Sequence, residues 1–201
     1  MGRYNFDKIV DRKHTKSLKY DFAVQRGKPA DVLPFWVADM DFEIPSELKQ
    51  VLLDRVNHGI FGYTESDDAY FNVLKEWFAN RFNWNIDKKW LVKTPGVVFA
   101  LAIAVRAFTK EGEGVLINQP VYYPFSMVID DNDRNLINVP LIQGEDKYTI
   151  DFEGVERAII EHNVTLFLLC NPHNPVGRVW TEDELKRLGD ICIKHNVIII
   201  S

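Results

Sequence analysis

Residues 165–177 read TLFLLCNPHNPVG, an apolar run followed by a loop with two Asn-Pro pairs and a glycine. A short apolar run bounded by turn residues is typical of a buried strand. Proline fixes φ and pushes the preceding residue toward an extended conformation, so the loop is expected to be rigid. We therefore expect the side chain of Asn174 to project in a defined direction at the carboxyl end of the strand. The alternative interpretation of this segment is an elaborate turn that binds no ligand.

Apolar runs of the same kind recur on both sides of this stretch. Four further strands are predicted in the segments WLVKT, GVLIN, LINVPL and VIIIS, which begin at Trp90, Gly114, Leu136 and Val197. Helical stretches separate them: 99–108 is apolar nearly all round, as a helix buried against a sheet should be, whereas 182–195 is amphipathic. Thr181 and Glu184 form a capping box before the second helix. This alternation predicts an α/β fold with a mostly parallel sheet and flanking helices.

The chain before this region has a different pattern. Residues 1 to about 35 are polar and aperiodic, which predicts an extended arm. A helix is predicted from Pro45-Ser46 to a stop at Gly59, and a second one over 69–82.

Composition and charge restrict the function. A formal net charge of -5, with 46% hydrophobic and 26% charged residues, indicates an ordinary globular protein and argues against a nucleic-acid or anionic-membrane partner. The N-terminus lacks an apolar signal-peptide core, and no apolar run is long enough to span a bilayer, so a cytoplasmic location is predicted. The two cysteines are expected to be buried free thiols. The five histidines have no metal-site spacing, and solvated or capping roles are expected for them.

Three other stretches carry candidate binding residues. Residues 94–98, TPGVV, follow a predicted strand and open a helix, where free backbone N–H groups could hold a phosphate; a plain turn is the alternative. Tyr122 in PVYYPF offers a ring on which a planar cofactor could stack, or simple packing. Tyr63 in FGYT could reach an anion or cap the core. The segment 36–42, WVADMDF, fits a loop packed against a cleft.

In this order, WVADMDF, HGIFGYT, TPGVVFAL, QPVYYPF and NPHNPVGRVW resemble the fold-type I pyridoxal-phosphate enzymes, the aminotransferase superfamily. More narrowly, they resemble its cystathionine β-lyase (C-S lyase, MalY/PatB-like) branch. The resemblance covers essentially the whole chain but only the N-terminal half of the family's length. It implies an arm or part of the small domain in residues 1–45 and an incomplete large cofactor-binding domain in 46–201.

The resemblance also implies roles for individual residues. Gly96, Val97 and Val98 match the loop whose backbone amides hold the phosphate of pyridoxal 5'-phosphate. Tyr122 matches the ring that stacks on the pyridine, and Asn174 matches the amide that bonds the phenolic oxygen. Tyr63 matches a tyrosine lent to the neighbouring subunit's phosphate, which implies a homodimer. Ala38 falls in the segment near the substrate carboxylate.

The implied reaction is the cleavage of cystathionine or another cysteine S-conjugate to a thiol, pyruvate and ammonia. The family's imine-forming lysine, the aspartate at the pyridine nitrogen and the carboxylate-binding arginine all match positions beyond Ser201, so no catalytic residue is assigned and the chain alone is expected to be inactive. Two alternatives stay open: an aminotransferase, and a non-catalytic binding or regulatory protein on the same fold.

Overall fold

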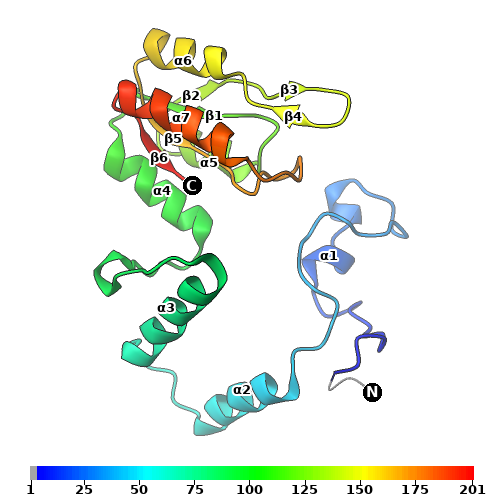
Figure 1. The fold of residues 1–201 in the computed structure, drawn as a ribbon. Coiled ribbons are helices and arrows are strands. Elements are labelled where there is room, and N and C mark those ends of the chain that lie inside the picture. Colours follow the sequence, from blue (N-terminus) through cyan, green and yellow to red (C-terminus); the bar gives the residue numbers. More distant parts are fainter. Residues whose placement is uncertain (1–3) are drawn as a thin grey trace. The chain divides into compact units, whose positions relative to one another are not determined.

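The computed structural model describes residues 4–201 and has two compact units, the first ending at Trp84 and the second running from Asn85 to Ser201 (Figure 1). The second unit is built on a four-stranded parallel sheet of order β2-β1-β5-β6. Its strands are β1 (Gly114–Ile117), β2 (Asn135–Asn138), β5 (Val164–Leu168) and β6 (Ile198–Ile200). The predicted α/β class with a parallel sheet is therefore confirmed.

Strand register places apolar side chains in rows on both faces of the sheet. Leu116 pairs with Ile137 on one side and with Phe167 on the other, and Phe167 pairs with Ile199. Because successive side chains in a strand point to opposite faces, their sequence neighbours, such as Leu166, form the row beneath. The two central strands are almost entirely buried. This explains why they read as continuous apolar runs rather than alternating ones.

Two pairs of helices cover the two faces of the sheet (Figure 1). Helices α4 (Val97–Phe108) and α5 (Pro124–Asp130) share one apolar cluster with Leu166, and α6 (Phe152–Glu161) and α7 (Glu182–Lys194) share the other with Phe167. A short antiparallel hairpin, β3 (Ile142–Gln143) and β4 (Tyr148–Thr149), lies outside the main sheet. Helices thus cover both faces of the sheet, as is typical of a parallel sheet.

The direction of α4 follows from its connection to β1. The residues 109–113 join the two elements, so α4 ends beside the amino edge of the sheet. Arg134, which precedes β2 at that edge, donates from Nε to Thr109 Oγ1 over 2.9 Å. Since 12 residues of helix span roughly 18 Å, the first turn of α4 lies toward the carboxyl edge of the strands.

Two sequence expectations in this unit are wrong. The segment WLVKT is not a strand: residues Lys88–Trp90 form a 3-10 turn, η2, capped by the Asp87 side chain, and residues 91–94 belong to neither sheet of the described part of the chain. Helix α4 is not buried all round either, because Leu101 and Val105 are buried while Phe99 and Ile103 remain about half exposed.

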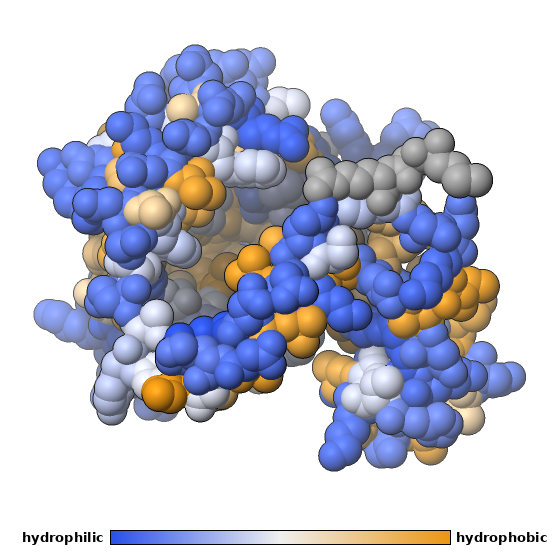
Figure 2. All heavy atoms as spheres, turned by 90° about the horizontal axis from the view of Figure 1, so that it is seen from below, coloured by the Kyte–Doolittle hydropathy of each residue, from blue (hydrophilic) through white to orange (hydrophobic). Residues whose placement is uncertain are grey.

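The first unit contains α1 (Leu18–Asp21), η1 (Val24–Arg26), α2 (Ser46–His58) and α3 (Asp68–Phe82). As predicted, α2 ends at Gly59, which takes φ of 75°, and α3 covers the second predicted helix. Hydrophobic side chains reach the molecular surface among hydrophilic ones (Figure 2). Among the described residues, no helix is both long and apolar enough to cross a membrane. The predicted domain boundary after residue 45 stays a prediction.

Candidate functional site

The loop that follows β5 holds Asn174 in a closed turn. The backbone N–H of His173 donates to the Arg178 carbonyl over 2.8 Å, and that of Gly177 donates to the His173 carbonyl over 2.7 Å. Gly177 has φ of 72°, a value that favours glycine. The Asn174 N–H points back to the sulfur of Cys170 at 3.4 Å, while the residue itself is exposed. The loop thus fixes the Asn174 backbone and leaves its side chain accessible.

Trp180 closes the base of this loop. Its side chain is buried, and its indole N–H donates to the Cys170 carbonyl over 3.0 Å. Its backbone N–H donates to Asn171 Oδ1 at 3.3 Å, which joins the two ends of the loop. The Arg178 guanidinium lies over the indole ring, 4.3 Å from the ring centre, and also pairs with Glu184 of α7. Loop and helix therefore support each other.

The loop after β1 places Tyr122 at the same edge of the sheet. The Asn118 amide donates to the Val139 carbonyl over 2.8 Å, and the Gln119 N–H donates to Asn138 Oδ1 over 3.0 Å, so the loop is tied to the end of β2. Tyr122 is 39% exposed, and its ring makes an edge contact with Tyr123 at 5.3 Å between ring centres. The Tyr122 side chain is therefore partly accessible at the carboxyl edge.

The first turn of α4 supplies free backbone donors. Gly96 is its N-cap, and no side chain caps the turn, so the N–H groups that begin the helix have no intrahelical partner. A side chain at Gly96 would meet no atom within 4 Å, so the space in front of the turn is open. Val97 is 75% exposed and Val98 is 40% exposed. Helix N-termini with open donors attract anions such as phosphate.

Topology brings these three candidate positions to one edge. Strands β1 and β5 are neighbours and parallel, so the loops with Tyr122 and Asn174 leave the sheet side by side. Residues Gly96, Val97 and Val98 begin a helix that packs on the same unit and points its N-terminus toward that edge. Ligands of open α/β sheets bind outside the carboxyl ends of the strands.

One histidine departs from the sequence expectation. His162 and His195 follow the last turns of α6 and α7 and cap them, as expected. His173, however, is only 2% exposed, so a solvated or capping role is wrong for it. Its Nε2 lies 2.9 Å from the carbonyl oxygen of Pro120, in the loop that carries Tyr122. The sequence segment NPHNP does not predict this contact, because Pro120 lies 53 residues earlier in the chain.

In the first unit, Ala38 directly precedes two aspartates, Asp39 and Asp41, that are bound by basic side chains. Asp41 accepts from Arg12 at 2.6 Å and from Lys19 at 2.8 Å, and it also accepts from the Tyr20 hydroxyl at 3.0 Å. Asp39 pairs with Arg12 as well. The hydrogen bonds from Lys19 and then Arg12 lower the pKa of Asp41 to about 2. Sequence reasoning missed this cluster, although the alternating acids of WVADMDF and the basic residues upstream were its signal.

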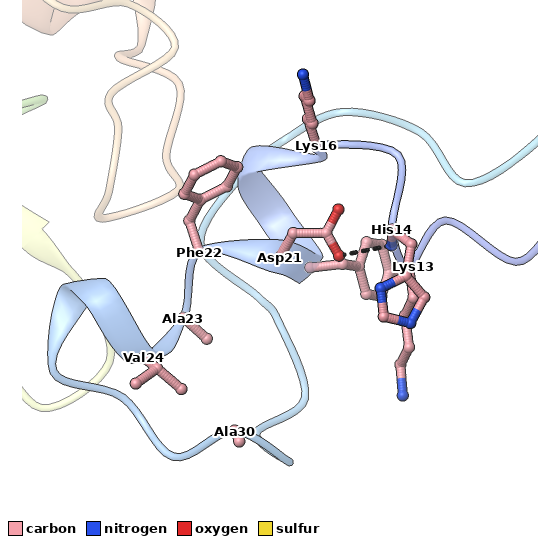
Figure 3. A pocket seen from close by; sticks show the side chains of 9 residues that line it. Lys13, His14, Lys16, Asp21, Phe22, Ala23, Val24 and Ala30 are labelled. Carbon is pink, nitrogen blue, oxygen red and sulfur yellow. Dashed lines mark hydrogen bonds between the residues drawn. The ribbon is translucent and has the colours of Figure 1, made fainter.

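Ala38 itself lines a hollow of about 440 Å³ together with Leu33, Val37, Lys19 and Asp41. A neighbouring hollow of about 520 Å³, with Lys13, His14 and Asp21 on its wall, contains neither of this unit's predicted site residues (Figure 3). The side chain of Tyr63 is fully exposed. The roles of Ala38 and Tyr63 stay predictions.

Comparisons with known proteins agree with this architecture. The model of the family "Aminotransferase class I and II" matches residues 30–201. Cystathionine beta-lyase PatB of Bacillus subtilis is 42% identical over 98% of this chain and 51% of its own length, and protein MalY of Escherichia coli is 34% identical over 98% and 51%. The crystal structure of cystalysin from Treponema denticola, which contains a pyridoxal 5'-phosphate cofactor, superposes with a TM-score of 0.88 at 40% identity, over 98% of this chain and 50% of that one. The chain thus spans about half the length of the relatives it matches.

Proposed function

The chain belongs to the aminotransferase class I and II family, and we propose that its activity is that of a pyridoxal-phosphate-dependent C-S β-lyase. The proposed substrates are cystathionine or other cysteine S-conjugates, and the products are a thiol, pyruvate and ammonia. The observation that carries the proposal is the meeting of an open helix N-terminus, a half-exposed tyrosine and a fixed asparagine at one sheet edge. Relatives named cystathionine beta-lyase at up to 42% identity support the lyase rather than the transferase.

The residues at this edge fit pyridoxal 5'-phosphate. The uncapped first turn of α4, with Gly96, Val97 and Val98, offers several N–H donors to a phosphate. Tyr122 offers a ring face to a pyridine, and the exposed Asn174 amide offers a donor to a phenolic oxygen. When bound, the cofactor serves as an electron sink that allows a leaving group to depart from the β-carbon of an amino acid.

The work of this chain's own residues in that reaction is orientation. The α4 turn would hold the phosphate of the cofactor through its free N–H groups, and Asn174 would hold the phenolic oxygen from a loop closed by Trp180. Tyr122 would stack on one face of the pyridine ring and exclude water from that face. We propose that Ala38 contacts the substrate, since the ion pairs of Asp39 and Asp41 restrain the backbone that directly follows it.

We also propose that the protein works as a cytoplasmic homodimer in which Tyr63 reaches the phosphate of the neighbouring subunit. The fully exposed Tyr63 side chain supports this arrangement, because such a large ring is free to enter a partner. We further propose that a polypeptide of residues 1–201 made alone releases no pyruvate, because the family resemblance assigns the imine-forming lysine to none of its residues.

The test is pyruvate release from cystathionine by the protein expressed from its complete coding region, with no keto acid added. A steady rate supports the lyase, whereas a rate that appears only with a keto-acid acceptor identifies an aminotransferase. If the protein shows no turnover in either assay but still binds a protein partner, it is a non-catalytic binding or regulatory protein. Tyr122→Ala is expected to lower kcat/KM at least about tenfold, while Tyr123→Ala in the same loop has an effect of less than about threefold.

A further inference from the structure

His173 is buried among groups that hold it in one orientation. The residue is 2% exposed, and its ring meets the Trp180 ring edge-on, with 5.4 Å between centres and planes at 82°. Its backbone N–H and carbonyl are both used within the loop, by Arg178 and Gly177. Neither the backbone nor the ring can turn without breaking these contacts.

The ring makes a directional contact with the neighbouring loop. Its Nε2 lies 2.9 Å from the Pro120 carbonyl oxygen, and a carbonyl can only accept, so the hydrogen of the neutral ring is on Nε2. Nδ1 is buried and has no hydrogen-bond partner among the described residues. Protonation would put a positive charge into this buried site, a cost that outweighs the nearby carbonyls of Pro120, Cys170 and Asn118, which favour the charged ring. Burial accordingly lowers the pKa of His173 below its usual 6.5, which keeps the ring neutral.

This contact stands between two of the proposed cofactor positions. Asn174 directly follows His173, and Tyr122 lies two residues after Pro120. Among the described residues, no other side-chain hydrogen bond joins these two loops. This hydrogen bond therefore links the two loops directly, in addition to the pairing of the parallel strands β1 and β5 that precede them.

We infer that His173 is a positioning residue, which sets the Tyr122 loop against the Asn174 loop through its Nε2–H···O=C bond to Pro120. The inference rests on the proposed function, because it gives these two loops a common ligand. A ring that only fills space needs volume and no donor. A positioning role needs the donor, and this difference separates the two explanations.

Two substitutions exploit the difference. In His173→Gln the side-chain amide can donate to the Pro120 carbonyl but loses the edge contact with Trp180. In His173→Phe the ring and its edge contact remain but the donor is lost. If His173 is a positioning residue, cofactor affinity should fall in the order wild type, His173→Gln, His173→Phe. If the ring only fills space, His173→Phe should bind the cofactor more tightly than His173→Gln.

The readouts are the equilibrium dissociation constant of pyridoxal 5'-phosphate and the circular dichroism band of the bound cofactor, measured on the protein expressed from its complete coding region. Loss of one hydrogen bond predicts roughly tenfold weaker binding and an altered band in His173→Phe. His173→Gln is expected to stay within about threefold of wild type. If His173→Phe has the same dissociation constant and the same circular dichroism band as the wild type, the positioning role is overturned and the proposed function is left intact. A wild type that binds no pyridoxal 5'-phosphate would overturn both.

A second measurement does not depend on the variants folding. In a 1H–15N spectrum of protein with 15N-labelled histidine, His173 is expected to show a protonated Nε2 and an unprotonated Nδ1 from pH 6 to 8. The opposite tautomer, or fast exchange between the two, would contradict the bond to Pro120 and with it the inference.

Discussion

At the scale of single residues, the ion pairs around Asp41 make a measurable electrostatic prediction. The pKa of Asp41 lies at about 2 instead of the usual 3.8, because Lys19 and then Arg12 donate to the carboxylate. Since the folded pKa is the lower one, the carboxylate adds stability that is complete above pH 3.8 and is lost as the pH falls toward 2. Acid should therefore release the segment around Ala38.

Lys19→Met tests this prediction. The substitution should raise the pKa of Asp41 toward 3.8, as read from the carboxyl 13C chemical shift during a pH titration. Lys13→Met is the matched control, because it removes the same charge from an exposed side chain that donates no bond to Asp41. An equal shift in both variants would mean that net charge, and not the Lys19 hydrogen bond, holds the pKa down.

At the scale of elements, the start of α7 depends on a reciprocal cap. The Glu184 N–H donates to the Thr181 hydroxyl over 3.3 Å, and the Thr181 N–H donates to the Glu184 carboxylate over 2.9 Å. Thr181→Ala is expected to lower the free energy of unfolding by about 1 kcal/mol, because one helix donor loses its partner. Thr181→Ser keeps the hydroxyl and should cost less than half as much. Urea denaturation of the two variants measures the difference, and equal losses would contradict the cap's importance.

The sequence predicted elements well where a segment's own residues decide its structure. Helix α7 was predicted from its capping box and amphipathic pattern, and β1 and β5 from apolar runs that are buried on both faces. The prediction of a strand at WLVKT is wrong because a strand needs a neighbour to share its hydrogen bonds, and a short apolar run says nothing about that neighbour. Helix α5 has seven residues, too few for a clear period, so it was expected only as an unspecified stretch between strands.

Much the same distinction applies to the candidate site. The open α4 turn and the exposed Asn174 follow from local signals, namely a Pro-Gly before an apolar helix and two Asn-Pro pairs. The contact of His173 with Pro120 and the pairing of Lys19 with Asp41 join residues 53 and 22 positions apart. Only the tertiary fold creates such contacts, so a local pattern such as the alternating acids of WVADMDF signals an ionic cluster but does not identify the partners.

At the scale of the whole molecule, α2 presents an apolar stripe. Leu48, Leu52 and Val56 are four residues apart and therefore share one face, and they are 56%, 59% and 59% exposed. A helix of a stable protein normally buries such a face. A second copy of the chain is the partner that the proposed homodimer supplies.

Leu52→Lys is accordingly expected to weaken dimerisation at least about tenfold, because it puts a charge into an apolar contact. Sedimentation velocity over a range of concentrations measures the dissociation constant. Asn57→Lys adds the same charge to the same helix at a polar, exposed position and should leave the dimer unchanged. A wild type that sediments as a monomer at all concentrations would contradict the homodimer.

The position of Glu184 has a consequence for how the site opens. Its carboxylate completes the cap of α7 and also pairs with Arg178, whose carbonyl accepts the His173 N–H. Fraying of the first helical turn therefore removes a restraint from the loop of Asn174. Loop amides and helix amides should exchange their hydrogens with solvent in the same opening event, so the site and the helix end form one cooperative unit.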